Sequence, residues 1–190
     1  MQTTNTNPYE HCPTYETGQF TLRLIREEDA PDLLACYADP AAAPIFNSDN
    51  CTSSFIYHTL EEMTNCVRFW VDSYRWQYFV RFSVVDKAKG KAVGTIEFFA
   101  KPGTFDGAGR VGVLRLDLAS PYEQEGMIAE ILQVVEEHFY GLFAVDSVIT
   151  KAVPQAAERI RALRGLGFQP VPDKAIVPYD HYYLRTRGER

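Results

Sequence analysis

The chain has 190 residues, of which 46% are hydrophobic and 23% are charged, so it is long enough and apolar enough for one folded domain. Its formal net charge of −6 argues against a nucleic-acid-binding protein, which would normally present a basic face. No apolar run approaches the roughly 18 residues that span a bilayer, no secretory signal is visible, and the four cysteines form no CxxC pair. We therefore expect a cytoplasmic protein with no membrane partner and no metal.

The N-terminal half predicts an arm, a strand and two helices. Residues 1–18 lack periodicity and are expected to form an arm outside the domain, which we place at residues 19–190. Thr59 and Glu62 form a capping box before a run of apolar residues at helical spacing, and Pro40 ends the shorter helix. The predicted elements are a strand at Phe20–Ile25, a helix over 29–39, a loop over 41–54 and a helix at Leu60–Tyr74.

The C-terminal half predicts a run of strands followed by alternating helices and strands. The first three strands are joined by connections too short for parallel pairing, which predicts an antiparallel meander. The predicted elements are strands at Tyr78–Asp86, Ala92–Ala100 and Val111–Ala119, a helix at Met127–Tyr140, a strand at Ser147–Val153, a helix over 156–165, and strands near Phe168 and at Tyr182–Thr186.

The loop between the predicted strand at Val111–Ala119 and the predicted helix at Met127–Tyr140 is a candidate anion site. A strand that runs through a tight turn into a helix directs several backbone N–H groups at one point, where the helix dipole adds positive charge. Gly126 would allow a phosphate to come close, although a glycine before a helix is also typical of an ordinary tight turn. Glu123 and Glu125 would repel a phosphate, or would simply favour the positive end of the helix dipole.

The order and spacing of four segments resemble the GCN5-related N-acetyltransferase (GNAT) family, in particular the branch that includes ribosomal-protein N-terminal acetyltransferases. The segments are FTLRLIREEDAPDLLACYADP from Phe20, VGTIEFF at Val93–Phe99, LDLASPYEQEGMIAEIL at Leu116–Leu132 and ERIRALRGLGF at Glu158–Phe168. The resemblance implies an α/β fold with a mixed, mostly antiparallel sheet of six to seven strands and helices on both faces. It also implies that two central strands separate and that acetyl-CoA, a co-substrate, lies between them.

The resemblance assigns cofactor-binding positions, with departures from the family pattern. That pattern, Gln/Arg-x-x-Gly-x-Gly/Ala, falls on residues 123–128, where only Gly126 matches and Ile128 replaces a small residue. The family's asparagine and its proton-donating tyrosine fall on Ala156 and Leu163, so the general acid is unassigned. The positions implied to bind acetyl-CoA are Leu116, Leu118, Gln124, Glu125, Gly126, Met127 and Ile128.

Two carboxylates on the strands that should border the cleft are candidate general bases. A partly desolvated carboxylate has a raised pKa and can take a proton from an attacking amine. Glu97 and Asp117 occupy such positions, but Arg115 precedes Asp117 by two residues, so an ion pair between them on one face is the structural alternative. Glu97 could likewise be an exposed or paired carboxylate.

The sequence thus predicts an enzyme that transfers an acetyl group from acetyl-CoA to a primary amine by direct attack in a ternary complex. The acceptor could be a small molecule, a peptide N-terminus or a lysine, and a homodimer is left open. The alternative is a catalytically degenerate member of the family that keeps the fold as a binding or regulatory module.

Overall fold

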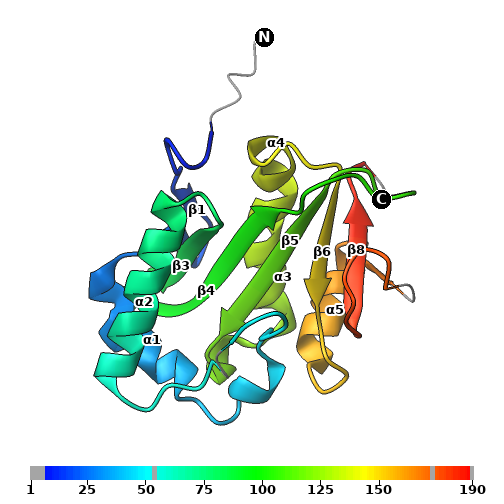
Figure 1. The fold of residues 1–190 in the computed structure, drawn as a ribbon. Coiled ribbons are helices and arrows are strands. Elements are labelled where there is room, and N and C mark those ends of the chain that lie inside the picture. Colours follow the sequence, from blue (N-terminus) through cyan, green and yellow to red (C-terminus); the bar gives the residue numbers. More distant parts are fainter. Residues whose placement is uncertain (1–6, 53–54, 172–173, 189–190) are drawn as a thin grey trace.

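Eight strands form one sheet in the computed structural model, which describes residues 7–52, 55–171 and 174–188 (Figure 1). Neighbouring strands are antiparallel except β5 and β6, which are parallel. The spatial order is β1 (Tyr15–Glu16), β2 (Phe20–Leu24), β3 (Val80–Asp86), β4 (Lys91–Ala100), β5 (Val111–Leu118), β6 (Ser147–Lys151), β8 (Tyr182–Thr186) and β7 (Gln169–Pro170). The mixed, mostly antiparallel sheet confirms the predicted fold class.

Helices cover both faces of the sheet. One face carries α1 and α2, which contact β4 and β3, and α3 lies on the other face, with α5 beside it (Figure 1). The helices are α1 (Ala30–Tyr37), α2 (Leu60–Arg75), α3 (Glu125–Val134), α4 (Tyr140–Leu142) and α5 (Ala157–Gly165), with 3-10 turns at Glu27–Asp29, Ala43–Ile45 and Ser120–Tyr122. No helix in the described ranges is both long and apolar enough to cross a bilayer.

Local sequence accounts for where the helices begin. The capping box before α2 is confirmed: the Thr59 hydroxyl accepts from the Glu62 amide at 3.2 Å, and the Glu62 carboxylate accepts from the Thr59 amide at 3.0 Å. Helix α3 begins two residues earlier than predicted, because Gln124 is extended and its carbonyl already accepts from the Ile128 amide. Glu125 and Gly126 therefore lie in the first helical turn and not in the loop.

Three further details differ from the prediction. The segment predicted as an arm contains β1, which adds a strand to the expected six or seven and pairs Tyr15 with Leu22. The long helix after the loop is interrupted by a π-helical segment at Val135–Phe139, where Phe139 packs on Phe82 and Phe98. The strand predicted to reach residue 153 ends at Lys151, because β8 pairs no further along it.

Candidate functional site

The parallel strands β5 and β6 separate along their length. Their register runs from Val111 opposite Ser147 to Leu114 opposite Thr150, and no residue of β6 pairs with β5 beyond that point. Figure 1 shows the two strands side by side at one end of the sheet and apart at the other. The second half of β5 therefore has β4 on one side and an open edge on the other.

Backbone groups of Leu116 and Leu118 face that open edge. The Val111 carbonyl accepts from Lys101 and the Ala119 amide donates to Val93, so the odd-numbered residues of β5 direct their backbone groups toward β4. Alternation along a strand then directs those of Leu116 and Leu118 the other way. Their side chains are buried in the core, so the backbone is what these two predicted site residues offer to a ligand.

The N-terminus of α3 lies at the end of this edge and carries unpaired amides. Among the described residues, the Gly126 and Met127 N–H groups have no acceptor, as expected for a first helical turn. A Cβ placed on Gly126 would meet no atom within 4 Å, so the space before it is open. Ile128 is fully buried in the core beneath the turn, so its bulk does not occupy that space.

The carboxylates around this helix start are paired with arginines of α5. Arg159 pairs with Glu123, and Arg161 pairs with Glu125 at 2.8 Å and with Glu158. Burial raises the pKa of Glu123, although Arg159 opposes that shift. Two arginines thus offset two of the three negative charges of Glu123, Glu125 and Glu158.

Glu158 occupies one of the helix-start amides. Its Oε2 accepts from the Glu125 N–H at 2.9 Å, and this bond, with the Arg161 guanidinium, lowers the pKa of the Glu158 carboxyl. The side chain of Gln124 is also engaged, since it donates to the Pro121 carbonyl at 2.8 Å. The Glu125 amide is therefore occupied, whereas those of Gly126 and Met127 have no acceptor in the part of the chain that the structure describes.

A row of charged side chains crosses the opposite face of the sheet, beneath α1 and α2. Both oxygens of Glu97 accept from guanidinium groups, Oε2 from Arg81 and Oε1 from Arg115 at 2.9 Å. The expected pairing of Arg115 with Asp117 is wrong: Arg115 lies opposite Glu97 in the register of β4 and β5, so it pairs across strands. Asp117 instead faces Arg81, with 3.6 Å between Asp117 Oδ2 and Arg81 Nη1.

Asp117 has a different environment from Glu97. Its Oδ2 accepts from the Tyr37 hydroxyl at 3.0 Å, while its Oδ1 has no partner among the described residues. Burial raises its pKa, against the opposing effect of Arg81. Burial alone would lower the pKa of Arg81. The neighbouring Glu97, Tyr37 and Asp117 outweigh that effect and raise the pKa, so Arg81 stays protonated.

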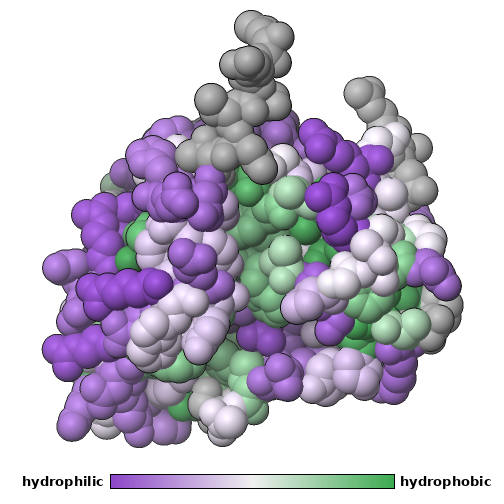
Figure 2. All heavy atoms as spheres, turned by 45° about the horizontal axis from the view of Figure 1, so that its top comes forward, coloured by the Kyte–Doolittle hydropathy of each residue, from purple (hydrophilic) through white to green (hydrophobic). Residues whose placement is uncertain are grey.

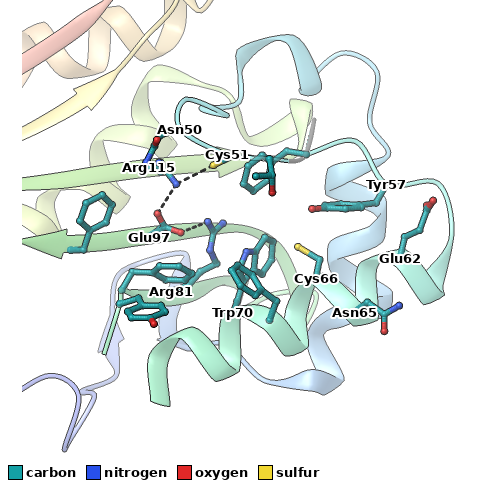
Figure 3. Close-up of a pocket in the computed structure, with 16 residues that line it drawn as sticks. Asn50, Cys51, Tyr57, Glu62, Asn65, Cys66, Trp70, Arg81, Glu97 and Arg115 are labelled. Carbon is teal, nitrogen blue, oxygen red and sulfur yellow. Dashed lines mark hydrogen bonds and ion pairs between the residues drawn. The ribbon is translucent and has the colours of Figure 1, made fainter. Parts of the chain in front are cut away.

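A cavity of about 740 Å³ opens beside this row, between α2 and strands β3 to β5. Figure 3 shows Glu97 between Arg81 and Arg115 on the cavity floor, with Tyr57, Cys66 and Trp70 toward the helix side. Figure 2 shows hydrophobic residues gathered in a hollow in the middle of the face that it presents. Aromatic side chains dominate the cavity walls; they include Tyr57, Phe69, Trp70, Tyr78, Phe79 and Phe99.

The loop between α1 and α2 crosses the gap between the separating strands. Asp49 accepts from Lys151 at 2.8 Å and from the Tyr182 hydroxyl at 3.2 Å, and its carbonyl accepts from Arg115 at 2.8 Å. One residue of this loop, coloured cyan in Figure 1, thus joins β5, β6 and β8. A lone Asp in a polar loop gives no signal of these partners in the sequence.

Sequence reasoning also missed Arg81 and Tyr37, which hold the two candidate carboxylates. Arg81 is buried on β3 with its guanidinium 4.0 Å from the centre of the Trp70 ring. An arginine within an apolar strand signals a buried partner, and that signal was present in the run VRFSVV. Ala156 and Leu163, at the positions where the family has polar residues, are buried and supply no proton donor.

Comparison with known proteins supports the fold independently. A family model described as an acetyltransferase (GNAT) domain matches residues 19–169. The structure is similar to the ribosomal-protein-S5-alanine acetyltransferase from Vibrio fischeri, with 16% identity and a TM-score of 0.69 over 93% of this chain and 97% of that one. It is also similar to a GNAT-family acetyltransferase from Bacillus anthracis, with 15% identity and a TM-score of 0.68 over 93% of this chain and 100% of that one. No match was found among curated protein sequences.

Proposed function

The chain belongs to the GNAT acetyltransferase family, and from that premise we propose that it transfers an acetyl group from acetyl-CoA to a primary amine in a ternary complex. The observation that carries the proposal is the open edge of β5, which leads directly to the unpaired amides of Gly126 and Met127. Strand-like hydrogen bonds suit a pantetheine chain, and helix-start amides suit a pyrophosphate.

The residues present fit acetyl-CoA. The backbone of Leu116 and Leu118 would bind the pantetheine amides, and the N–H groups of Gly126 and Met127 would bind the pyrophosphate. Arg159 and Arg161 offset Glu123 and Glu125, which reduces the repulsion expected from the acidic loop. The buried side chain of Ile128 leaves the helix start accessible.

The chain's own residues would position the amine and take its proton. The acceptor enters from the face of α1 and α2, where the aromatic cavity opens beside β4 and β5. A carboxylate would remove one proton from the ammonium group; Asp117 is favoured by its raised pKa and by its Oδ1, which has no hydrogen-bond partner among the described residues. When bound, acetyl-CoA would supply the acetyl group: the amine nitrogen bonds to the thioester carbonyl carbon, the C–S bond breaks, and the leaving thiolate takes the second nitrogen proton and becomes the thiol.

Two observations favour the alternative, a catalytically degenerate binding module. The Glu158 carboxylate already accepts from the Glu125 amide, where an anionic ligand would otherwise bind. Leu163 also provides no proton for the leaving thiolate. A binding module of this kind would bind acetyl-CoA weakly or not at all.

Calorimetry with acetyl-CoA distinguishes the two. We predict heat of binding for the unmodified protein and none at millimolar ligand for Gly126→Trp, because a Cβ at this position meets no atom within 4 Å and the indole would obstruct the space at the start of α3. Gly141→Trp is the matched control: this helical glycine in α4 also has nothing within 4 Å of an added Cβ, and its substitution should leave binding intact. Absence of binding in the unmodified protein would refute the transferase, and equal binding by Gly126→Trp would refute the docking position.

A further inference from the structure

The aromatic cavity beside the charged row offers a chemically specific site for the acceptor. Its volume of about 740 Å³ lies in the usual range for small-molecule sites. Trp70 and Phe79 supply apolar walls, while Phe69 and Tyr78 are more than half exposed at the mouth. Such walls favour a ligand with an aromatic or large apolar body, since long flexible polar chains gain little from burial there.

The charge that a ligand meets on the cavity floor is that of a guanidinium. Glu97 is 1% exposed and both of its oxygens are engaged, whereas the Arg115 side chain is 12% exposed. Arg81 is fully enclosed between Trp70 and its acidic partners. The other acid that lines the cavity, Glu62, is exposed and lies on the far side of the cavity from Arg115 (Figure 3), where its Oε2 accepts from the His58 and Thr59 amides and caps α2. No carboxylate of the floor is therefore available to an ammonium group.

Arg115 retains unused donors. Its Nη1 donates to Glu97 and to the Cys51 sulfur, and its Nη2 donates to the Asp49 carbonyl. A guanidinium has five N–H donors, and among the described residues the Nε of Arg115 has no partner. The Nε is itself buried, so the donor left for a ligand is the second N–H of Nη2, and arginine N–H groups bind carboxylates with charge-assisted hydrogen bonds.

We propose that the acceptor is an amine that also carries a carboxylate and an aromatic body, as in an aromatic α-amino acid, with the ring in the cavity, the carboxylate on Arg115 and the amine toward the open edge of β5. This inference rests on the proposed function, since it names the acceptor of the same reaction. It disfavours lysine-like and polyamine acceptors, because a second cationic group on the cavity floor would lie against Arg115, and the Glu62 carboxylate lies on the far side of the cavity.

Tryptophan fluorescence tests the binding half of this proposal without acetyl-CoA. The chain has two tryptophans, and Trp76 lies outside the cavity and is 58% exposed, so Trp76→Phe leaves Trp70 as the sole reporter. In that variant we expect 3-phenylpropionate and phenylalanine to change the Trp70 emission with a Kd about tenfold or more below that of 2-phenylethylamine. Arg115→Gln should reduce this preference to about threefold or less, whereas Arg110→Gln, on the exposed pair with Asp146, should leave it unchanged.

The outcomes separate the acceptor proposal from the proposed function. Equal or tighter binding of 2-phenylethylamine, or no response to any aromatic probe, overturns the acceptor proposal even if acetyl-CoA binds. Binding of phenylalaninamide as tight as that of phenylalanine also overturns it, and favours a peptide N-terminus. Conversely, carboxylate-selective binding in a protein that gives no heat with acetyl-CoA supports the pocket and refutes the transferase. Should Arg115→Gln fail to fold, the probe series in Trp76→Phe alone decides.

Discussion

Asp117 and Glu97 are two buried carboxylates on adjacent strands with opposite prospects as proton acceptors. Glu97 is saturated by two guanidinium groups, whereas Asp117 keeps one oxygen without a partner among the described residues and has a pKa raised by burial. A base works in its deprotonated form, so a raised pKa moves the acid limb of the rate profile to higher pH. Because Glu97 holds Arg115, its loss should weaken acceptor binding more than it slows the chemistry.

We therefore predict that Asp117→Asn lowers kcat roughly 100-fold and removes the acid limb from the pH dependence of kcat. Glu97→Gln should instead raise KM for the acceptor, with a smaller change in kcat and the acid limb retained. Steady-state thiol release across the pH range measures both. If the acid limb vanished in Glu97→Gln and persisted in Asp117→Asn, the two roles would have to be exchanged.

At the level of single residues, the sequence identified the two candidate carboxylates but not the side chains that bind them. Glu97 and Asp117 were candidates because they are acids on strands that were expected to border the cleft. Their partners Arg81, Arg115 and Tyr37 are fixed by strand register and by the packing of α1, neither of which a single sequence specifies. The roles of both carboxylates stay predictions.

Helix α3 and helix α5 meet where the pyrophosphate is proposed to bind. Glu158 of α5 caps the Glu125 amide and competes with any anion for the positive end of the α3 dipole. We predict that Glu158→Gln tightens acetyl-CoA about two- to fivefold, because it removes a negative charge from an exposed site. Calorimetry at low salt measures the change, and the gain should shrink as salt is added.

A matched control separates this local effect from a change in overall charge. Glu27→Gln removes the same charge from an exposed ion pair with Arg68, beside α2. It should leave the affinity for acetyl-CoA unchanged. If both variants tightened binding equally, the effect would be a long-range one, and if Glu158→Gln weakened binding, Glu158 would be a positioning residue and not a competitor.

Elements with strong local signals were predicted well, and those fixed by tertiary packing were not. The capping box of α2, the meander of β3 to β5 and the order of the later elements follow from periodicity and turn chemistry. Two features depend on contacts with Phe82 and Phe139, which no local sequence pattern predicts. They are the pairing of Tyr15–Glu16 with β2 and the π-helical segment. The division of the chain at residue 18 stays a prediction.

At the scale of the molecule, the site follows from the way one sheet separates. β4 supports one side of β5 along most of its length, while β6 leaves the other side after Leu114. α3 then begins at the end of the exposed edge, and the loop around Asp49 covers the gap from the face of α1 and α2. In the proposed function, backbone groups would bind acetyl-CoA and side chains from the opposite face would bind the acceptor.

The most direct test of this arrangement is an amide NMR titration of the isotopically labelled protein with acetyl-CoA. We predict that the amides of Leu116, Leu118, Gly126 and Met127 shift and exchange more slowly with solvent, while those of Val80 and Phe82 on β3 change little. Largest changes at any other part of the sheet, or none at millimolar ligand, would contradict the assignment of the β5 edge and the α3 start as the acetyl-CoA site.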